Sequence, residues 1–236
     1  MAETEKEINH VHAVIEKELK AARLSESNSK IKSMLMYSGG ADSFSLAKGL
    51  LEATEHEIIL HHVVIRNREK RDQFQLKTLD KQFDYLRKTT REFQVLKSAY
   101  EIPLETKQVG LDRTTCLFFG ARACAAMRNQ VAAVYTGCIE PQFWELHQGS
   151  SVLNSVFVHL RYKPSWLRPF KFLARQVNQG KSTIYKNIGE EGLNLTVSCR
   201  SPKPDGDKFI SCLKCHACKL RAKVVDSLGW DKSLVK

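Results

Sequence analysis

Two groups of residues in this chain have side chains and spacings suited to chemistry. The first is a short glycine-containing string, Ser38-Gly39-Gly40-Ala41-Asp42-Ser43. The second is a set of four cysteines near the end of the chain: Cys199, Cys212, Cys215 and Cys218. Backbone amides in the first string could hold an anion, and the four thiols could hold a metal ion.

The first string, hereafter the glycine turn (residues 38–43), lies between a predicted strand and a predicted helix. The apolar run at residues 33–37 predicts a buried strand, and apolar residues recur at helical spacing from Phe44 to Leu51. Two glycines let the backbone bend tightly, and the first amides of the helix face the same point. The turn therefore predicts a phosphate site, although Asp42 and Ser43 could instead simply cap the helix.

The four cysteines, hereafter the cysteine cluster, predict a metal site. Thiolates at short spacings suit one tetrahedral Zn²⁺, and closed four-cysteine sites are usually structural. An iron–sulfur cluster is the main alternative, and reduced buried thiols are the simplest one. The basic neighbours Lys214, Lys219 and Arg221 do not resemble a core. We expect His216 to be an exposed residue rather than a ligand.

The segments between these groups predict an α/β fold. The chain has 236 residues, 42% of them hydrophobic, which is enough for one core with a small appended segment. We expect strands at residues 57–65 and 131–137, and helices at 121–130 and 182–188. We also expect a long helix after the strand at 57–65, with an apolar face formed by Leu76, Leu79, Phe83, Leu86 and Phe93. Strands alternating with helices predict a doubly wound parallel sheet, whose ligands bind beyond the carboxyl ends of the strands.

The cysteine count and the lack of long apolar runs indicate the cellular compartment in which we expect the protein to work. The chain has seven cysteines, and neither a secretory signal nor a membrane-spanning run is evident. We therefore expect a reducing, cytoplasmic environment without disulfides or membrane contact.

The glycine turn resembles the PP-loop of the N-type ATP pyrophosphatases. That family cleaves ATP between the α and β phosphates, transfers AMP to a substrate oxygen and leaves pyrophosphate in the loop. A second phosphate motif is excluded: Gly180-Lys181-Ser182-Thr183 is similar to the end of a Walker A loop, but Arg175 stands where its first glycine is required. The resemblance therefore implies adenylation rather than kinase chemistry.

The cysteine cluster narrows the resemblance to the 7-cyano-7-deazaguanine synthases, over residues 34–230. Phe119-Gly120-Ala121-Arg122 stands where that family has a Pro-Gly-Arg-Asn loop, and residues 135–140 resemble its strand-end Thr-Gly segment. Two segments depart from the family. Residues 61–69 lack its aromatic-Asp-Tyr-Gly-Gln sequence, and residues 141–147 replace its acidic-aromatic region, so the partners of the base, nucleotide or acceptor could differ.

This resemblance implies an ATP-dependent ligase of queuosine-type biosynthesis that uses Mg²⁺, Zn²⁺, 7-carboxy-7-deazaguanine and ammonia, and that forms a homodimer. It assigns the pyrophosphate to Gly39, Gly40 and Ser43, the magnesium to Asp42 and a supporting contact to Ser38. Further cations would be Arg122 and Lys181, and the nucleotide pocket would include Thr136 and Gly137. A plain surface role is the alternative for Arg122 and Lys181, and a plain strand-end turn for Thr136 and Gly137.

On this basis we divide the chain into three parts. We expect an amphipathic helical extension at residues 1–30. We expect an ATP-binding α/β domain of the adenine nucleotide alpha hydrolase type at residues 31–195, and a zinc segment packed on that domain at residues 196–236.

The net charge of +11 raises a different class of function, since basic proteins often bind nucleic acid. A PP-loop enzyme that thiolates tRNA would share the ATP motif, and residues 161–175 interleave basic and aromatic side chains that could contact a nucleic-acid strand. We favour a solvated surface for that stretch. A PP-loop relative acting on a protein or in DNA modification is a third alternative.

Overall fold

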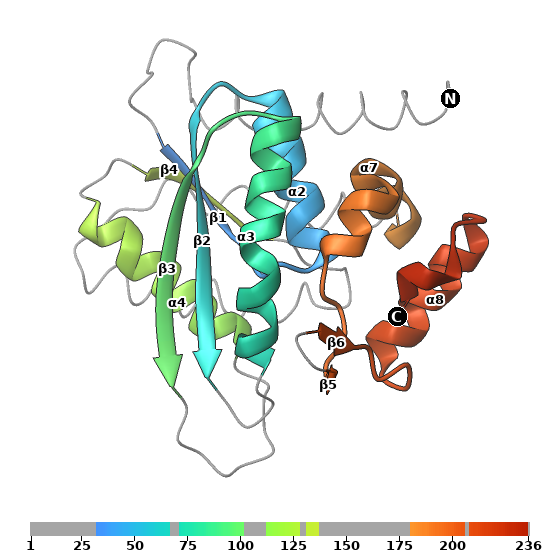
Figure 1. Cartoon of the computed structure of the whole chain (residues 1–236). Coiled ribbons are helices and arrows are strands. Elements are labelled where there is room, and N and C mark those ends of the chain that lie inside the picture. The colour runs from blue at the N-terminus through green and yellow to red at the C-terminus, as the bar shows by residue number, and fades with distance from the viewer. Residues whose placement is uncertain are drawn as a thin grey trace.

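A computed structural model describes residues 32–66, 71–101, 112–127, 131–136, 180–205 and 208–235 of the chain. The predicted N-terminal extension, Gly137 and the basic-aromatic stretch at 161–175 lie outside these residues. The described residues form a sheet covered by helices, followed by a C-terminal segment that contains a hairpin and one helix (Figure 1).

The sheet has four strands, all parallel, in the spatial order β3-β2-β1-β4. In chain order its elements are β1 (Lys32–Met36), α2 (Ala41–Ala53), β2 (Glu57–Arg66), α3 (Arg71–Thr89), β3 (Gln94–Glu101), α4 (Asp112–Ala126) and β4 (Val131–Thr136). Met36 pairs with His61 on one side and with Thr136 on the other, so β1 and β4 end at the same edge. The predicted α/β class and parallel sheet are confirmed.

The C-terminal segment follows α7 (Gly180–Leu195). It contains the hairpin strands β5 (Lys203–Asp205) and β6 (Lys208–Ile210), the helix α8 (His216–Ser227) and a short 3₁₀ helix, η2 (Lys232–Val235). Val224, Val225 and Leu234 of this segment are buried in the same hydrophobic core as Leu35 of β1 and Phe44 of α2. The segment therefore shares a core with the α/β part.

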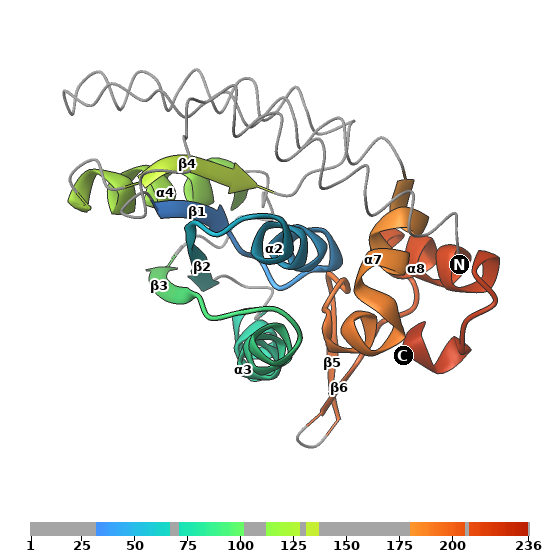
Figure 2. The same ribbon diagram turned by 90° about the horizontal axis from the view of Figure 1, so that it is seen from above.

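Helices cover both faces of the sheet. Figure 2 shows α2 and α3 on one face and α4 on the other. Right-handed crossovers produce this arrangement when the chain adds β2 and β3 on one side of β1 and then returns to add β4 on the other. α4 packs closely on β1: a Cβ atom added to Gly120 would lie only 2.7 Å from the Met36 sulfur, so a larger residue would not fit there without a shift.

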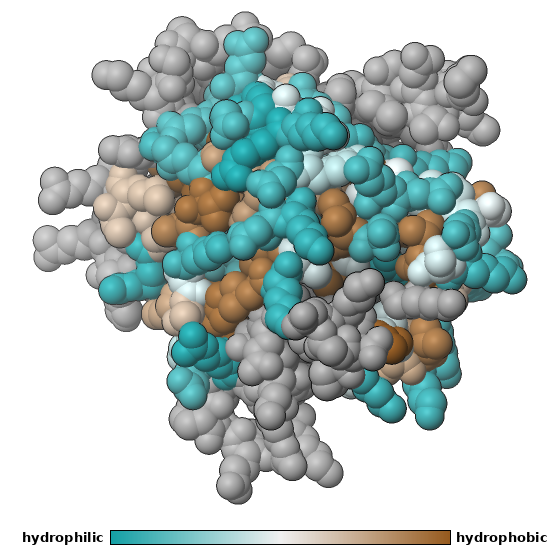
Figure 3. All heavy atoms as spheres, in the orientation of Figure 1, coloured by the Kyte–Doolittle hydropathy of each residue, from teal (hydrophilic) through white to brown (hydrophobic). Residues whose placement is uncertain are grey.

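Side-chain alternation along the strands divides the core into two layers. Leu35, Ile58 and Leu60 pack with α2 and α3, while Met34, Met36 and Ile59 pack on the α4 side. The predicted apolar face of α3 lies in the first layer, where Leu79 and Leu86 are fully buried. The helix ends at Thr89, so Phe93, which was expected on the same face, lies outside it. Figure 3 shows the resulting surface on one face, where hydrophilic side chains predominate and hydrophobic ones show in patches between them.

The structure differs from the expected elements in three places: one strand was not predicted, and two helices have other bounds. β3 had not been predicted, because this edge strand carries exposed polar residues such as Gln94, Lys97 and Glu101. α4 begins nine residues before the expected Ala121, so residues 119–122 are helical and not the loop that the resemblance suggested. The segment lacks a proline that would interrupt the helix. α7 extends beyond the expected 182–188 on both sides.

None of the described helices combines the length and the hydropathy that crossing a bilayer requires.

Two buried histidines in β2 make stability depend on pH. His61 and His62 are almost fully buried, and His61 Nδ1 and His62 Nε2 have no hydrogen-bond partner among the described residues. Burial, with a smaller contribution from His62, lowers the pKa of His61 to about 4. An unfolded histidine takes up a proton near pH 6.5, so between about pH 6.5 and 4 the unfolded state binds more protons and folding weakens as the pH falls.

We therefore predict that His61→Gln flattens the acid dependence of stability. The gap between pKa values of about 6.5 and 4 corresponds to about 3 kcal/mol. Urea unfolding at pH 7 and pH 4 should show the original protein losing about that much more stability than the variant. Equal losses in both proteins would mean that His61 does not resist protonation in the fold.

Candidate functional site

The glycine turn has the geometry of an open helix start. It directly follows β1, and Gly39 adopts a left-handed backbone with φ +76°, which favours glycine. Gly40 is the N-cap of α2 and makes no side-chain capping bond. The first amides of α2 therefore lack intrahelical partners and carry the positive end of the helix dipole, as an anion site requires.

Two serines brace the turn from within. The Ser43 hydroxyl is buried, donates to the Gly40 carbonyl at 3.1 Å and accepts from the Ser38 amide at 3.2 Å. The hydroxyls of Ser38 and Ser43 lie 3.0 Å apart. Ser43 thus stabilises the turn itself, in addition to any contact with a ligand.

An ion pair closes one side of the turn. Lys181, in the first turn of α7, donates from Nζ to Asp42 Oδ1. The two side chains are partly buried, with exposed fractions of 16% and 24%, and lie 139 positions apart in the chain. The fold therefore brings together two of the predicted site residues as a cation and an anion beside the helix start.

The other predicted residues are less closely associated with the turn. Thr136 ends β4 and is half-buried, directly opposite Met36 at the end of β1. Arg122 is exposed on α4, and among the described residues no hydrogen bond or ion pair joins it to the turn. Gly137 lies outside the described residues.

Gln82 holds the glycine turn through hydrogen bonds from the core side. Its role was not predicted from the sequence. This fully buried residue of α3 accepts from the Tyr37 hydroxyl at 2.6 Å. Its Nε2 donates to the carbonyls of Gly39 at 3.1 Å and Leu195 at 2.7 Å. The Gly39 carbonyl also accepts from the Val197 amide at 3.3 Å. The Gly39 peptide is thereby held with its oxygen toward the core.

We predict that Gln82→Met destabilises the protein by about 3 kcal/mol. The variant keeps the approximate volume but removes both donors and leaves the buried Tyr37 hydroxyl unpaired, and each unsatisfied buried group costs about 1–3 kcal/mol. Urea unfolding measures the change, with Tyr37→Phe as the milder comparison at about 1 kcal/mol. A loss below about 1 kcal/mol for Gln82→Met would contradict the bracing role.

The segment between the turn and the cysteine cluster is firmly anchored. Val197, which contacts Gly39, is two residues before Cys199. Arg221 of α8 is buried and donates to the carbonyls of Leu193 at 2.7 Å and Thr196 at 3.0 Å. The cysteine cluster and the glycine turn are thus connected through one short, hydrogen-bonded stretch of chain.

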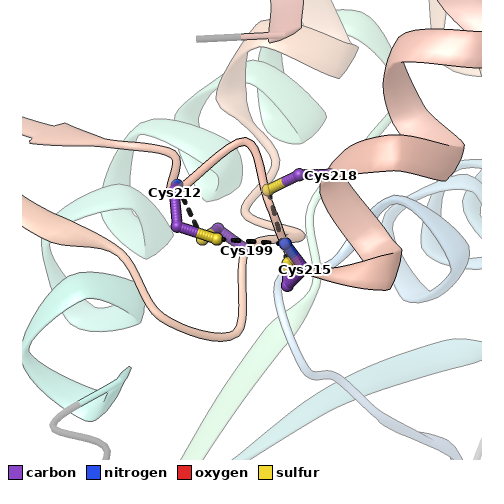
Figure 4. Close-up of side chains that lie close together, drawn as sticks. All are labelled: Cys199, Cys212, Cys215 and Cys218. Carbon is purple, nitrogen blue, oxygen red and sulfur yellow. Dashed lines mark hydrogen bonds between the residues drawn. The ribbon is translucent and has the colours of Figure 1, made fainter.

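The structure brings all four predicted metal ligands together. The sulfurs of Cys199, Cys212, Cys215 and Cys218 lie within 4.8 Å of one another. Figure 4 shows their side chains converging from the connection between α7 and β5, the loop after β6 and the start of α8. Zinc–sulfur bonds of about 2.3 Å place tetrahedral sulfurs about 3.8 Å apart. The cluster could therefore hold a metal ion such as zinc.

Backbone amides favour the thiolate forms of Cys199 and Cys212, although burial raises the pKa of Cys199 above its usual value. Cys199 Sγ accepts from the amides of Cys212 at 3.2 Å and Ser201 at 3.4 Å. Hydrogen bonds from the amides of Lys214 and Cys215 lower the pKa of Cys212 to about 6. Such bonds prepare sulfurs for a cation, because the metal ligand is the thiolate. The exposed His216 is the first residue of α8, as expected for a residue outside the ligand set.

A scan against protein-family models and a search of curated proteins both returned no match. The chemistry of the two sites therefore follows from their residues. The glycine turn offers helix amides, a carboxylate and an ammonium group, and the cysteine cluster offers four sulfur ligands.

Proposed function

We propose that this chain is a PP-loop ATP pyrophosphatase that adenylates a carboxylate, as 7-cyano-7-deazaguanine synthases do. The observation that carries the proposal is the uncapped start of α2 beside the Asp42–Lys181 pair, at the carboxyl edge of a parallel sheet. Amides and an ammonium group suit pyrophosphate, and a carboxylate suits its Mg²⁺. The same string of residues is what resembles the PP-loop.

The fit to magnesium pyrophosphate follows from the charges. In the structure Asp42 and Lys181 satisfy each other, so a ligand must supply a partner for each. Mg²⁺ would take the carboxylate and a phosphate oxygen would take the ammonium group, which leaves neither charge unpaired. We assign the remaining pyrophosphate contacts to the amides of Gly39 and Gly40, with Ser38 and Ser43 in support.

The strand order supports a nucleotide crevice beside the turn. β2 and β4 flank β1, and their connections leave in opposite directions, so the edge beyond β1 would be the switch point of a doubly wound sheet of the adenine nucleotide alpha hydrolase type. Thr136 ends its strand at this edge and, with Gly137, is proposed to line the nucleotide pocket. Arg122 remains a predicted phosphate contact.

The proposed reaction has two adenylation steps. The carboxylate of 7-carboxy-7-deazaguanine attacks the α-phosphate of ATP and releases pyrophosphate; ammonia then displaces AMP to give the amide. In the second step the amide oxygen attacks the α-phosphate of another ATP and releases pyrophosphate. The C–O bond to AMP then breaks, and the nitrogen loses its two protons to leave the nitrile. The protein contributes by holding the two reactants in line and by neutralising charge on the leaving pyrophosphate, which is the role assigned to Lys181.

The cysteine cluster has a structural role in this proposal. Four sulfurs complete a tetrahedral zinc shell, so no open position remains for a substrate. We propose that zinc holds residues 196–236 against the ATP-binding domain, residues 31–195. We further propose that the protein is a cytoplasmic homodimer and that its product is used in queuosine-type biosynthesis.

Mass spectrometry of the reaction products tests the proposed substrate. Purified protein would be incubated with 7-carboxy-7-deazaguanine, an ammonium salt and Mg-ATP, beside an Asp42→Ala variant. Nitrile together with AMP, absent in the variant, supports a synthase; amide alone supports the first adenylation only. No deazapurine product from folded, metal-loaded protein would overturn the substrate assignment and favour a tRNA, DNA or protein acceptor.

A further inference from the structure

The C-terminal segment carries a group of exposed cations that the ATP chemistry does not use. Five basic side chains are exposed there and form no ion pair with another described residue: Arg200, Lys203, Lys214, Lys219 and Lys223. Asp226 lies one helical turn after Lys223 in α8, but its carboxylate is paired with Lys232 at 3.4 Å. We call these five residues the basic stripe.

Three members of the basic stripe lie in the backbone around the cysteine cluster. Arg200 directly follows Cys199 in the chain, and Lys214 lies between Cys212 and Cys215. The Lys219 amide donates to the Cys215 carbonyl at 3.0 Å. Each cation therefore extends from backbone that wraps the same four sulfurs.

The other two members lie on the two elements that flank the cysteine cluster in the chain, the β5–β6 hairpin and α8. Lys203 pairs with Ile210 in the β5–β6 hairpin. Lys223 lies one helical turn after Lys219 on the exposed side of α8, since Cys218, Arg221 and Val225 occupy its buried side. The five cations thus lie on the hairpin, around the cysteine cluster and on α8, which follow one another in the C-terminal segment (Figure 1).

Two exposed aliphatic side chains lie within the basic stripe. Leu213 is 52% exposed and Ile210 is 45% exposed, and they are neighbours of Cys212 in the chain. Leu213 also has a left-handed backbone, φ +57°. Glycine would adopt this backbone without strain, whereas leucine is disfavoured there. A strained residue whose large apolar side chain faces solvent is a reason to look for a partner.

We propose that the basic stripe, with Leu213 and Ile210, is a docking surface for a single-stranded nucleic acid. Exposed cations that pair with no described carboxylate match the repeated charge of a phosphate backbone, and the two aliphatic side chains offer contacts to unstacked bases. The net charge of +11 adds a general attraction for polyanions. This surface is separate from the glycine turn and does not depend on adenylation.

Salt-dependent binding of labelled RNA tests the proposal in the full-length, metal-loaded protein. Fluorescence anisotropy with a mixed-sequence strand of about 16 nucleotides would be measured over a salt series. Lys214→Gln combined with Lys219→Gln should reduce the slope of log K against log salt by about 1.4, at about 0.7 for each phosphate that is no longer neutralised. The matched control, Lys81→Gln combined with Lys88→Gln, removes two exposed charges of α3 and should leave the slope unchanged.

Leu213→Gly provides a second variant that is safe for the fold. It removes the exposed side chain and suits the left-handed backbone, so the melting temperature should hold or rise while RNA affinity falls about fivefold. The proposal is overturned if the original protein does not bind RNA, if the two double variants lose affinity equally, or if Leu213→Gly binds as tightly as the original. Binding to anionic phospholipid vesicles without binding to RNA would also overturn it.

Discussion

Lys181→Met is expected to lower kcat for AMP formation from ATP about 10²–10³-fold, the usual effect of removing one group that stabilises transition-state charge. The ammonium group of Lys181 lies at the start of α2 through its bond to Asp42, where the leaving pyrophosphate is proposed to bind. Its attraction for phosphate oxygens grows as charge develops on the leaving group, so the loss should fall mainly on kcat rather than on KM. Steady-state kinetics with varied ATP measures both parameters.

Lys186→Met is the matched control for this prediction. Lys186 lies on the same helix, α7, and the substitution removes the same charge with the same replacement side chain. It should change kcat less than about threefold, because among the described residues it makes no bond to the glycine turn. Equal losses in the two variants would show that only the helix or the overall charge matters, and would remove Lys181 from the site.

Loss of the metal is expected to have the largest effect on stability. Structural zinc sites contribute about 10 kcal/mol or more of apparent binding free energy, and the binding is coupled to folding. Removing the metal would take from the four thiols, which lie within 4.8 Å of one another, the ion that is proposed to hold the loop after β6 to α8. We predict one zinc per chain, and we predict that chelation exposes residues 196–236 to proteases. Metal analysis and limited proteolysis with mass spectrometry measure these two outcomes.

Single substitutions separate the cluster from cysteine chemistry in general. Cys212→Ser should lose most of the metal and unfold at a lower urea concentration, since it removes the thiol whose pKa is about 6 in the structure. Cys116→Ser, outside the cluster, should retain a full equivalent of zinc. Full zinc occupancy in Cys212→Ser would contradict the four-sulfur site, and iron with sulfide in the original protein would support the iron–sulfur alternative.

The sequence predicted the parts of the site that depend on nearby residues. The glycine turn is encoded by the apolar run before it and the helical spacing after it, and the structure has β1 and α2 there. Three cysteines of the cluster fall within seven residues, and their spacing alone indicated a shared ligand. β2 was predicted because a strand buried on both faces is continuously apolar, apart from its two histidines.

Contacts between distant residues could not be predicted in this way. Gln82 is an ordinary polar residue in a charged helix, and its role appears only when the fold brings it to Gly39 and to Leu195, which is 113 positions away. The pairing of Lys181 with Asp42 is similarly remote. β3 was missed because an edge strand is only partly buried, so its sequence lacks the apolar run that identified β2. The four-residue match at 119–122 suggested a loop, but local helix propensity and packing against Met36 prevail.

The products formed from ATP test the central claim most directly. The protein would be incubated with Mg-ATP, 7-carboxy-7-deazaguanine and ammonium, and nucleotides and phosphates would be quantified by chromatography and ³¹P nuclear magnetic resonance. Adenylation at the glycine turn predicts AMP and pyrophosphate in equal amounts, with both lost in Asp42→Ala. ADP and inorganic phosphate, or AMP formation that survives in Asp42→Ala, would contradict it.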